Sequence, residues 1–249
     1  MIECKRCGSM NSDTAKFCKH CRSLLKTASE NNNAKSNQSN PVDFQKSVEE
    51  AKKSIVQIKT AFLDPETKRP GIGAGTGFVV EGGFVVTNCH NLEGLRISET
   101  TATFDPSVDS VTYNLKLICA VPEADIAVLR FQGLMDKVMS KRPHLKIRTN
   151  PPLAMGESVY TIGNPLNLGI SVNTGLVSHP ARRFNHRGLS ELVQITISLN
   201  HGNSGGPLLD MDNNVVGITT AGFSKPGADM CVPAAEIVKI LDRIKEVGE

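Results

Sequence analysis

Short apolar runs rich in Val, Ile and Thr set the strongest limit on the fold of this chain, because Gly, Asn, Asp or Pro breaks each of them after a few residues. Such runs suit β-strands, since branched side chains pack well on a pleated sheet and the breaking residues favour turns. The pattern predicts many short strands, among them Ser54–Thr60, Gly77–Val80, Phe84–Thr87, Val159–Ile162, Val193–Ser198 and Val215–Thr220. We therefore expect one large, all-β domain.

The last apolar segment changes from strand to helix periodicity. Ile237, Ile240, Leu241 and Ile244 recur with helical spacing, and Pro233 suits a helix start. We therefore expect a C-terminal helix packed on the β domain. The chain is 39% hydrophobic but has no Trp and two Tyr, so mainly aliphatic side chains must fill the core.

Two Cys-x-x-Cys pairs indicate that the N-terminal segment is a separate small domain. Cys4 pairs with Cys7 and Cys18 with Cys21, and ten residues separate Cys7 from Cys18. Four thiolates suit tetrahedral structural Zn²⁺. A segment this short cannot build a sufficient hydrophobic core, so the metal would supply most of its folding free energy. The pattern predicts a zinc ribbon over residues 1–26, with two disulfides or free thiols as the alternative.

Residues 27–46 are polar and rich in Asn and Ser, which predicts a flexible linker before a domain at 47–249. Residues 1–26 carry six basic and two acidic side chains, a balance of +4. A basic ribbon could bind nucleic acid. A protein-docking role is an equal alternative, and the charges could also compensate the thiolates.

The remaining cysteines and the hydropathy suggest a compartment. Cys89, Cys119 and Cys231 each lie in an apolar stretch and are interpreted as reduced thiols. No signal peptide precedes the ribbon, and no apolar run approaches the roughly 18–20 residues that cross a bilayer. We therefore expect a cytoplasmic protein without a membrane partner.

The segment Gly202-Asn203-Ser204-Gly205-Gly206-Pro207 places a serine hydroxyl among glycines. Without Cβ, the main chain can approach a bound carbonyl and point N–H groups at the oxygen that becomes negative. His90 ends one predicted strand, and Asp125 begins another apolar run. The order His, Asp, Ser is that of chymotrypsin-type proteases.

These three residues suit a catalytic triad. Ser204 would attack the scissile carbonyl, His90 would accept and later return the proton, and Asp125 would hold the imidazole. The backbone N–H groups of Gly202 and Ser204 would form the oxyanion hole.

From about Ser47 onward the chain resembles a trypsin-like serine protease of the HtrA (Deg) type. The matching motifs are Gly73–Val80, Thr87–His90, Asp125–Leu129, Gly163–Leu166 with Thr174–Ser178, Gly202–Pro207 and Val215–Ala221. The resemblance implies a chymotrypsin-like double β-barrel with the triad between the barrels. It also implies protein or peptide substrates and no cofactor for catalysis.

Two features depart from the family. HtrA proteins usually continue into a PDZ domain, and this sequence ends soon after the expected terminal helix. Asn203 stands where digestive trypsins have an Asp that pairs with a freshly cut N-terminus. An amide cannot make that ion pair, so activation by N-terminal cleavage is not expected.

The pocket for the substrate's P1 side chain, which precedes the scissile bond, is expected to be lined by Ser198, Leu199, Thr219, Thr220 and Ala221. None of them is acidic, so we expect a small or medium aliphatic P1 residue. Asp229 would favour a basic P1 residue if it pointed into the pocket, but its alternation with Met230 suggests that it points away.

The sequence thus predicts a serine endopeptidase that works through an acyl-enzyme. The alternative is a catalytically dormant protein of the same fold that serves as a binding scaffold recruited through the ribbon. The intact triad argues against loss of the catalytic residues. It does not argue against an oxyanion hole that is latent until a trigger acts.

Overall fold

The structure is a computed structural model that describes residues 2–4, 7–12, 15, 17–22, 41–63, 67, 69–92, 96–106, 111–164, 169–186, 189–222 and 229–248. Most of the predicted linker, residues 27–40, lies outside the described residues, as do Pro165 and Leu166 of one quoted motif. The chain divides into two compact units, Met1–Ser39 and Asn40–Glu249.

The smaller unit contains a short antiparallel pair of strands, β1 (Ile2–Glu3) and β2 (Met10–Asn11). Among the described residues of this unit, Cys4 and Cys18 are the buried apolar ones, Ala15 and Cys21 pack against them, and Asn11 is also buried. The core of this unit therefore consists largely of cysteine sulfur, as expected for a segment with so few apolar residues.

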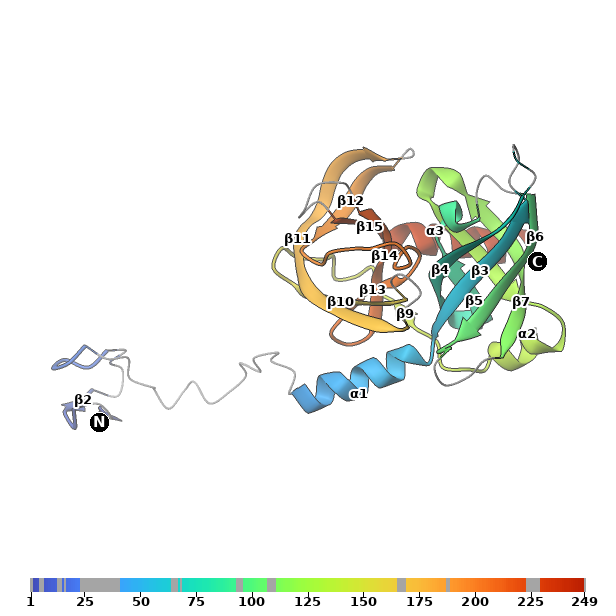
Figure 1. The fold of residues 1–249 in the computed structure, drawn as a ribbon. Coiled ribbons are helices and arrows are strands. Elements are labelled where there is room, and N and C mark those ends of the chain that lie inside the picture. The colour runs from blue at the N-terminus through green and yellow to red at the C-terminus, as the bar shows by residue number, and fades with distance from the viewer. Residues whose placement is uncertain are drawn as a thin grey trace. The chain divides into compact units, whose positions relative to one another are not determined.

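The first half of the larger unit is a closed antiparallel barrel with the strand order β3-β4-β5-β8-β7-β6 (Figure 1). Its strands are β3 (Ile55–Leu63), β4 (Pro70–Val80), β5 (Phe84–Thr87), β6 (Arg96–Phe104), β7 (Thr112–Val121) and β8 (Ile126–Phe131). The predicted strands at 54–60, 77–80 and 84–87 are confirmed as β3, the end of β4, and β5.

The second half is a sheet in the order β13-β10-β11-β12-β15-β14-β9, which the pairing of β13 with β14 closes into a second barrel. Its strands are β9 (Lys146–Ile147), β10 (Ser158–Gly163), β11 (Ser171–His186), β12 (Leu189–Ile195), β13 (Pro207–Asp210), β14 (Asn214–Gly222) and β15 (Asp229–Pro233). The two barrels and the terminal helix agree with the expected chymotrypsin-like architecture.

Strand alternation divides the core into three parts. Val79, Val85 and Leu129 face the interior of the first barrel, whereas their neighbours Phe78 and Val86 face the second barrel. A separate cluster fills the second barrel, with residues from each of β10 to β15 but none from β9: Val159, Val177, Val193, Ile195, Ile197, Leu208, Val216 and Cys231. The two barrels thus meet across a continuous apolar interface.

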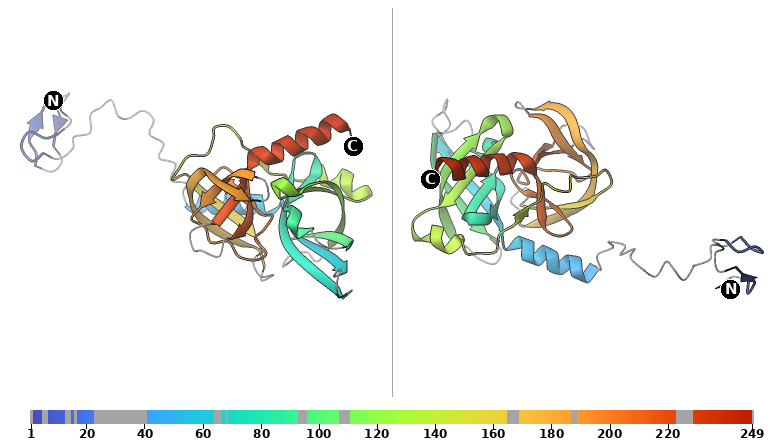
Figure 2. Two further views of the ribbon diagram at one scale, coloured as in Figure 1. Left: turned by 90° about the horizontal axis from the view of Figure 1, so that it is seen from above. Right: turned by 180° about the vertical axis from the view of Figure 1, so that it is seen from behind.

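Helices complete the larger unit. α3 (Ala234–Val247) runs along the back of both barrels (Figure 2) and buries Ile237, Ile240 and Leu241, which confirms the predicted terminal helix. α1 (Pro41–Lys52) begins within the segment that the sequence assigns to the linker. Its Phe44 ring meets the Tyr160 ring edge-on at 5.2 Å. The shorter helices are η2 (Glu81–Gly83), η3 (Cys89–Asn91), η4 (Pro122–Ala124) and α2 (Leu134–Met139).

One predicted strand is shorter than expected. β12 ends at Ile195 instead of continuing to Ser198. The N–H of Leu199 bonds to Asp229 Oδ1 at 3.0 Å, so the chain leaves the sheet toward the loop that carries Ser204. Among the described residues, no helix combines the length and the apolar character that a membrane span requires.

Candidate active site

His90 and Asp125 come together because the strands next to them are paired. His90 lies in η3, directly after β5, and Asp125 lies between η4 and β8. Antiparallel pairing sets Thr87 of β5 opposite Ala127 of β8. The end of one strand and the start of the other therefore meet at the same edge of the first barrel.

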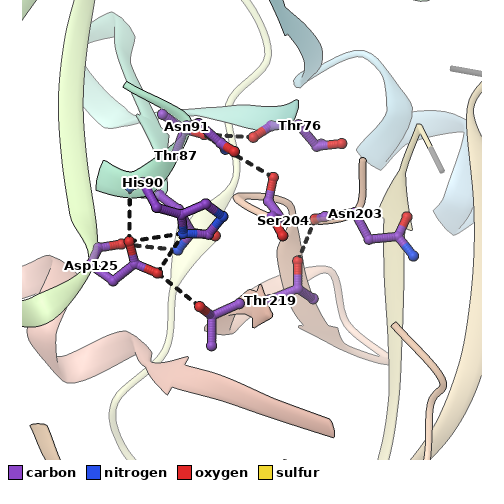
Figure 3. A network of polar contacts seen from close by, with 10 residues as sticks. Thr76, Thr87, His90, Asn91, Asp125, Asn203, Ser204 and Thr219 are labelled. Atoms are coloured by element: carbon purple, nitrogen blue, oxygen red, sulfur yellow. Dashed lines mark hydrogen bonds and ion pairs between the residues drawn. The ribbon is translucent and has the colours of Figure 1, made fainter. Parts of the chain in front are cut away.

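The His90 ring faces the Asp125 carboxylate directly (Figure 3). Its Nδ1 lies 2.8 Å from Oδ2 and 3.0 Å from Oδ1, and the His90 backbone N–H donates to Oδ1 at 3.0 Å. With an ionised Asp125, Nδ1 carries the proton and Nε2 keeps its lone pair. The contact therefore sets the tautomer that a general base needs.

Asp125 is held from three sides. Asn88 Nδ2 donates to its backbone carbonyl at 2.9 Å, and Thr220 Oγ1 donates to Oδ2 at 2.8 Å. Its φ of 50° is left-handed, an uncommon conformation for a residue with a side chain. Burial raises the pKa of Asp125, but the hydrogen bond and charge of His90, with the Thr220 hydroxyl, outweigh burial and lower it. The carboxylate is fully buried and remains ionised.

The loop that carries Ser204 belongs to the second barrel, but residues of the first barrel donate hydrogen bonds to its backbone. The Thr76 N–H and Asn91 Nδ2 donate to the Ser204 carbonyl at 3.0 and 3.1 Å, and Thr76 Oγ1 donates to the Gly202 carbonyl at 2.6 Å. Gly205 has a φ of 85°, and a Cβ there would collide with Thr87 Oγ1 and the Thr76 carbonyl. Glycine is therefore required for this close approach.

The predicted oxyanion hole consists of the backbone N–H groups of Gly202 and Ser204. The Asn203 carbonyl accepts Thr219 Oγ1 at 2.6 Å, and a trans peptide directs the Ser204 N–H the opposite way. Gly202 has a φ of 95°, in the region that favours glycine. Within the described chain, neither the Gly202 N–H nor the Ser204 N–H has an intramolecular acceptor. Both donors are thus available for a negative oxygen.

Ser204 lies across the His90 ring from Asp125 in Figure 3 and is partly exposed. Its hydroxyl makes no hydrogen bond to the described part of the chain. Catalytic hydrogen bonds are often long in ligand-free structures and tighten when substrate binds. The structure therefore brings all three predicted residues to one edge of the barrel interface, with a hydrogen-bonded His–Asp pair.

The residues expected to line the P1 pocket differ in how exposed their side chains are. Ser198 is exposed, and Leu199 is half-buried against the core of the second barrel. Thr219 and Thr220 are buried, with their hydroxyls bonded to the Asn203 carbonyl and to Asp125. The Ala221 side chain lies outside the described residues. A substrate could reach the two threonines through their backbone only.

Sequence reasoning missed the supporting contacts of Thr76, Asn91 and Thr220. Thr76 and Asn91 belong to or adjoin motifs that carry the family resemblance, but their partners are more than 100 residues away. No local pattern predicts such pairs. Asn203 is also unusual, because neither polar atom of its buried amide has a partner in the described chain.

A second candidate site lies in the smaller unit. The sulfur atoms of Cys4, Cys7, Cys18 and Cys21 all lie within 4.8 Å of one another and form no disulfide. The pairs Cys4–Cys21 and Cys7–Cys18 are each 3.6 Å apart. Tetrahedral zinc with Zn–S bonds of about 2.3 Å needs sulfur separations of about 3.8 Å. The four ligands therefore fit a single metal ion.

The surroundings act differently on two of these thiols. Hydrogen bonds with Ser9 lower the pKa of the Cys7 thiol, but burial and the thiols of Cys21 and Cys18 outweigh them and raise it. The surroundings of Cys18 favour its thiolate form. The backbone N–H of Cys21 lowers the pKa of the Cys18 thiol against the opposing effect of burial, and the N–H of His20 acts in the same direction. The His20 N–H lies 3.4 Å from the Cys18 sulfur, and Asn11 Nδ2 lies 3.7 Å from it. Thiolates are the form that binds metal.

Comparison with known proteins gives consistent matches for the larger unit. A family model described as a trypsin-like peptidase domain matches residues 75–218. Protease Do-like 1, chloroplastic, of Arabidopsis thaliana is 31% identical over 186 residues, which cover 71% of this chain and 40% of the relative. A probable periplasmic serine endoprotease DegP-like of Brucella suis is 32% identical over 74% of this chain and 35% of its own.

Serine protease HTRA1 of Xenopus tropicalis is 32% identical over 203 residues, which cover 78% of this chain and 41% of the relative. The matched region therefore spans less than half the length of each of these curated relatives.

Proposed function

Because the chain belongs to the trypsin-like peptidase family, we propose that it is a serine endopeptidase with His90, Asp125 and Ser204 as its catalytic triad. The observation that carries the proposal is the contact of His90 Nδ1 with both oxygens of the buried Asp125 carboxylate, at 2.8 and 3.0 Å. Proteins or peptides are the substrates, and the chemistry uses side chains and water without a cofactor.

The acylation step begins at Ser204. Its Oγ attacks the scissile carbonyl carbon while His90 Nε2 accepts the hydroxyl proton, and the negative charge moves to the carbonyl oxygen. The C–N bond then breaks, and the imidazolium gives its proton to the departing amine. Water repeats the sequence on the acyl-enzyme, which releases the acid and restores Ser204. Asp125 stabilises the imidazolium in both halves of the reaction and keeps its own charge.

The N–H groups of Gly202 and Ser204 stabilise the oxyanion. Each such donor typically contributes about 2.7–4 kcal/mol to the transition state. The orientation of the Ser204 N–H depends on the bond from Thr219 Oγ1 to the Asn203 carbonyl, because that bond fixes the peptide plane. In this proposal the Thr219 bond orients one of the two donors before substrate binds.

The cysteine cluster is proposed to hold structural Zn²⁺ through Cys4, Cys7, Cys18 and Cys21. The metal would stabilise the fold of the smaller unit, whose core is otherwise two buried cysteines and their neighbours. The cytoplasmic location expected from the sequence and a macromolecular partner for the ribbon stay predictions.

A fluorophosphonate probe tests the peptidase proposal, because it reacts covalently with an activated serine. Wild-type protein should be labelled at Ser204, and both Ser204→Ala and His90→Gln should abolish labelling. Ser158→Ala changes an exposed serine at the start of β10 and should have no effect. If wild type resists labelling under all conditions, the dormant scaffold becomes the better description.

A further inference from the structure

Resting on the proposed peptidase function, we propose that Asp229 forms the floor of the P1 pocket and selects peptides with Arg or Lys at P1. This specificity differs from the aliphatic preference that the sequence suggests. It follows from the direction of the Asp229 side chain, the segments that flank it, and the absence of a cationic partner within the described chain.

The direction of Asp229 is set by the pairing of β15. Asp229 is opposite Ile195 of β12, and Cys231 is opposite Val193, so all four side chains share one face of the sheet. Ile195, Val193 and Cys231 belong to the interior cluster of the second barrel. Met230 between them belongs to the interface with the first barrel. The Asp229 carboxylate therefore points into one end of the second barrel.

The effect of Asp229 on a neighbour supports this placement. Burial raises the pKa of the Cys231 thiol well above its usual range, and the charge of Asp229 adds to that rise. This effect agrees with the strand register, which places the carboxylate on the same side of β15 as the thiol.

The Asp229 carboxylate lies between the two chain segments that are expected to flank the P1 pocket. Its Oδ1 accepts the N–H of Leu199 at 3.0 Å, and Leu199 lies three residues before Gly202. On the other side, Asp229 is paired with Gly222 of β14, two residues after Thr220, which bonds to Asp125. The strands β12, β15 and β14 lie side by side in this order (Figure 1). Asp229 therefore lies between the segment that leads to Ser204 and the end of β14.

The Asp229 carboxylate has no cationic partner among the described residues. The residue is 7% exposed, and in the described chain Leu199 donates its one hydrogen bond. Oδ2 has no partner there, and no Lys, Arg or His of that part lies within ion-pair distance. Burial of a carboxylate without a counter-charge is costly. The guanidinium or ammonium group of a substrate would supply that counter-charge, whereas an aliphatic P1 residue would only remove the remaining water.

The test compares substrates that differ in one charge. Peptides with P1 Arg and with P1 citrulline, its neutral isostere, are cleaved by full-length protein. We expect kcat/KM to favour Arg by at least about tenfold, since a charge-assisted hydrogen bond contributes about this much or more. Asp229→Asn keeps an acceptor for the Leu199 N–H and should bring the ratio close to one. Asp212→Asn, in the exposed turn between β13 and β14, should leave the ratio unchanged.

A second measurement does not depend on catalysis. Fluorescent p-aminobenzamidine carries a cationic amidine and should bind to Ser204→Ala, and the added Asp229→Asn substitution should weaken binding at least about tenfold. The proposal is overturned if labelled, active enzyme prefers Val or Leu over Arg at P1, or if Asp229→Asn changes neither the ratio nor amidine binding. Loss of fluorophosphonate labelling with intact, Asp229-dependent amidine binding would overturn the peptidase function alone.

Discussion

Thr76 of β4, in the first barrel, donates its hydroxyl to the carbonyl of Gly202 in the second barrel at 2.6 Å. The hydroxyl oxygen of Thr76 also accepts the backbone N–H of Asn164 at 3.1 Å. One buried threonine thus joins β4 of the first barrel to two loops of the second. The position of the proposed oxyanion hole relative to His90 should depend on this link, because His90 belongs to the first barrel.

Thr76→Val should impair catalysis more than it impairs folding. The Gly202 carbonyl and the Asn164 N–H would both lose a partner, at about 1–3 kcal/mol each. We expect kcat to fall by about tenfold to a hundredfold with a smaller change in KM, because a misplaced oxyanion hole affects the transition state most. Thr76→Ser keeps the hydroxyl and should retain most activity. Equal kinetics for Val and Ser would contradict a role for this bond.

Thr220→Val removes the hydroxyl that donates to Asp125 Oδ2. A hydrogen bond to a charged group contributes about 1.5–3 kcal/mol, so urea unfolding at pH 7 should show a loss of that order. The pKa of Asp125 is lowered in the folded protein, so its stabilisation is present above the ordinary pKa of about 3.9 and is lost as pH falls below it.

The difference between Thr220→Val and wild type should therefore shrink as the pH falls below the ordinary Asp pKa of about 3.9 and Asp125 takes up a proton. Thr220→Ser is the matched control and should follow wild type. A difference that stays constant across this pH range would show that lost packing, and not the hydrogen bond to the carboxylate, explains the destabilisation.

Metal removal should affect one unit of the chain alone. Full-length protein should contain one zinc ion by mass spectrometry, and a strong chelator should abolish hydrogen-exchange protection in residues 2–22. The thermal transition of Asn40–Glu249 should not move, because the two units have separate cores. Cys18→Ser should behave like chelated protein, and Cys119→Ser, in β7, should keep its zinc. Full protection in the chelated protein would rule out a structural metal.

Phe44→Ala should show that α1 is an integral part of the larger unit. Phe44 is half-buried and meets the ring of Tyr160 edge-on. We expect a loss of about 1–3 kcal/mol in the free energy of unfolding, less than for a fully buried Phe. Gln45→Ala, at the next, exposed position, should change it by less than about 0.5 kcal/mol. Similar values for the two variants would mean that the helix contributes little.

Local patterns were sufficient for much of this protein. The branched apolar runs predicted β3, β5, β10 and β14, and the helical spacing of Ile237, Ile240 and Leu241 predicted α3. Such signals are local, because a strand or helix needs one apolar face that repeats along the chain. The two Cys-x-x-Cys pairs likewise predicted a compact cluster of four sulfurs, since the spacing itself brings the thiols close.

The tertiary structure decided the side-chain contacts between residues that are distant in the sequence. The sequence by itself named His90, Asp125 and Ser204, but the contact between His90 and Asp125 depends on the pairing of β5 with β8. Thr220 and Thr76 acquire their roles through residues on the other barrel. For Asp229, alternation with Met230 showed that the two residues face opposite sides, but not which side is the barrel interior. That depends on strand register across the sheet, which no single strand encodes.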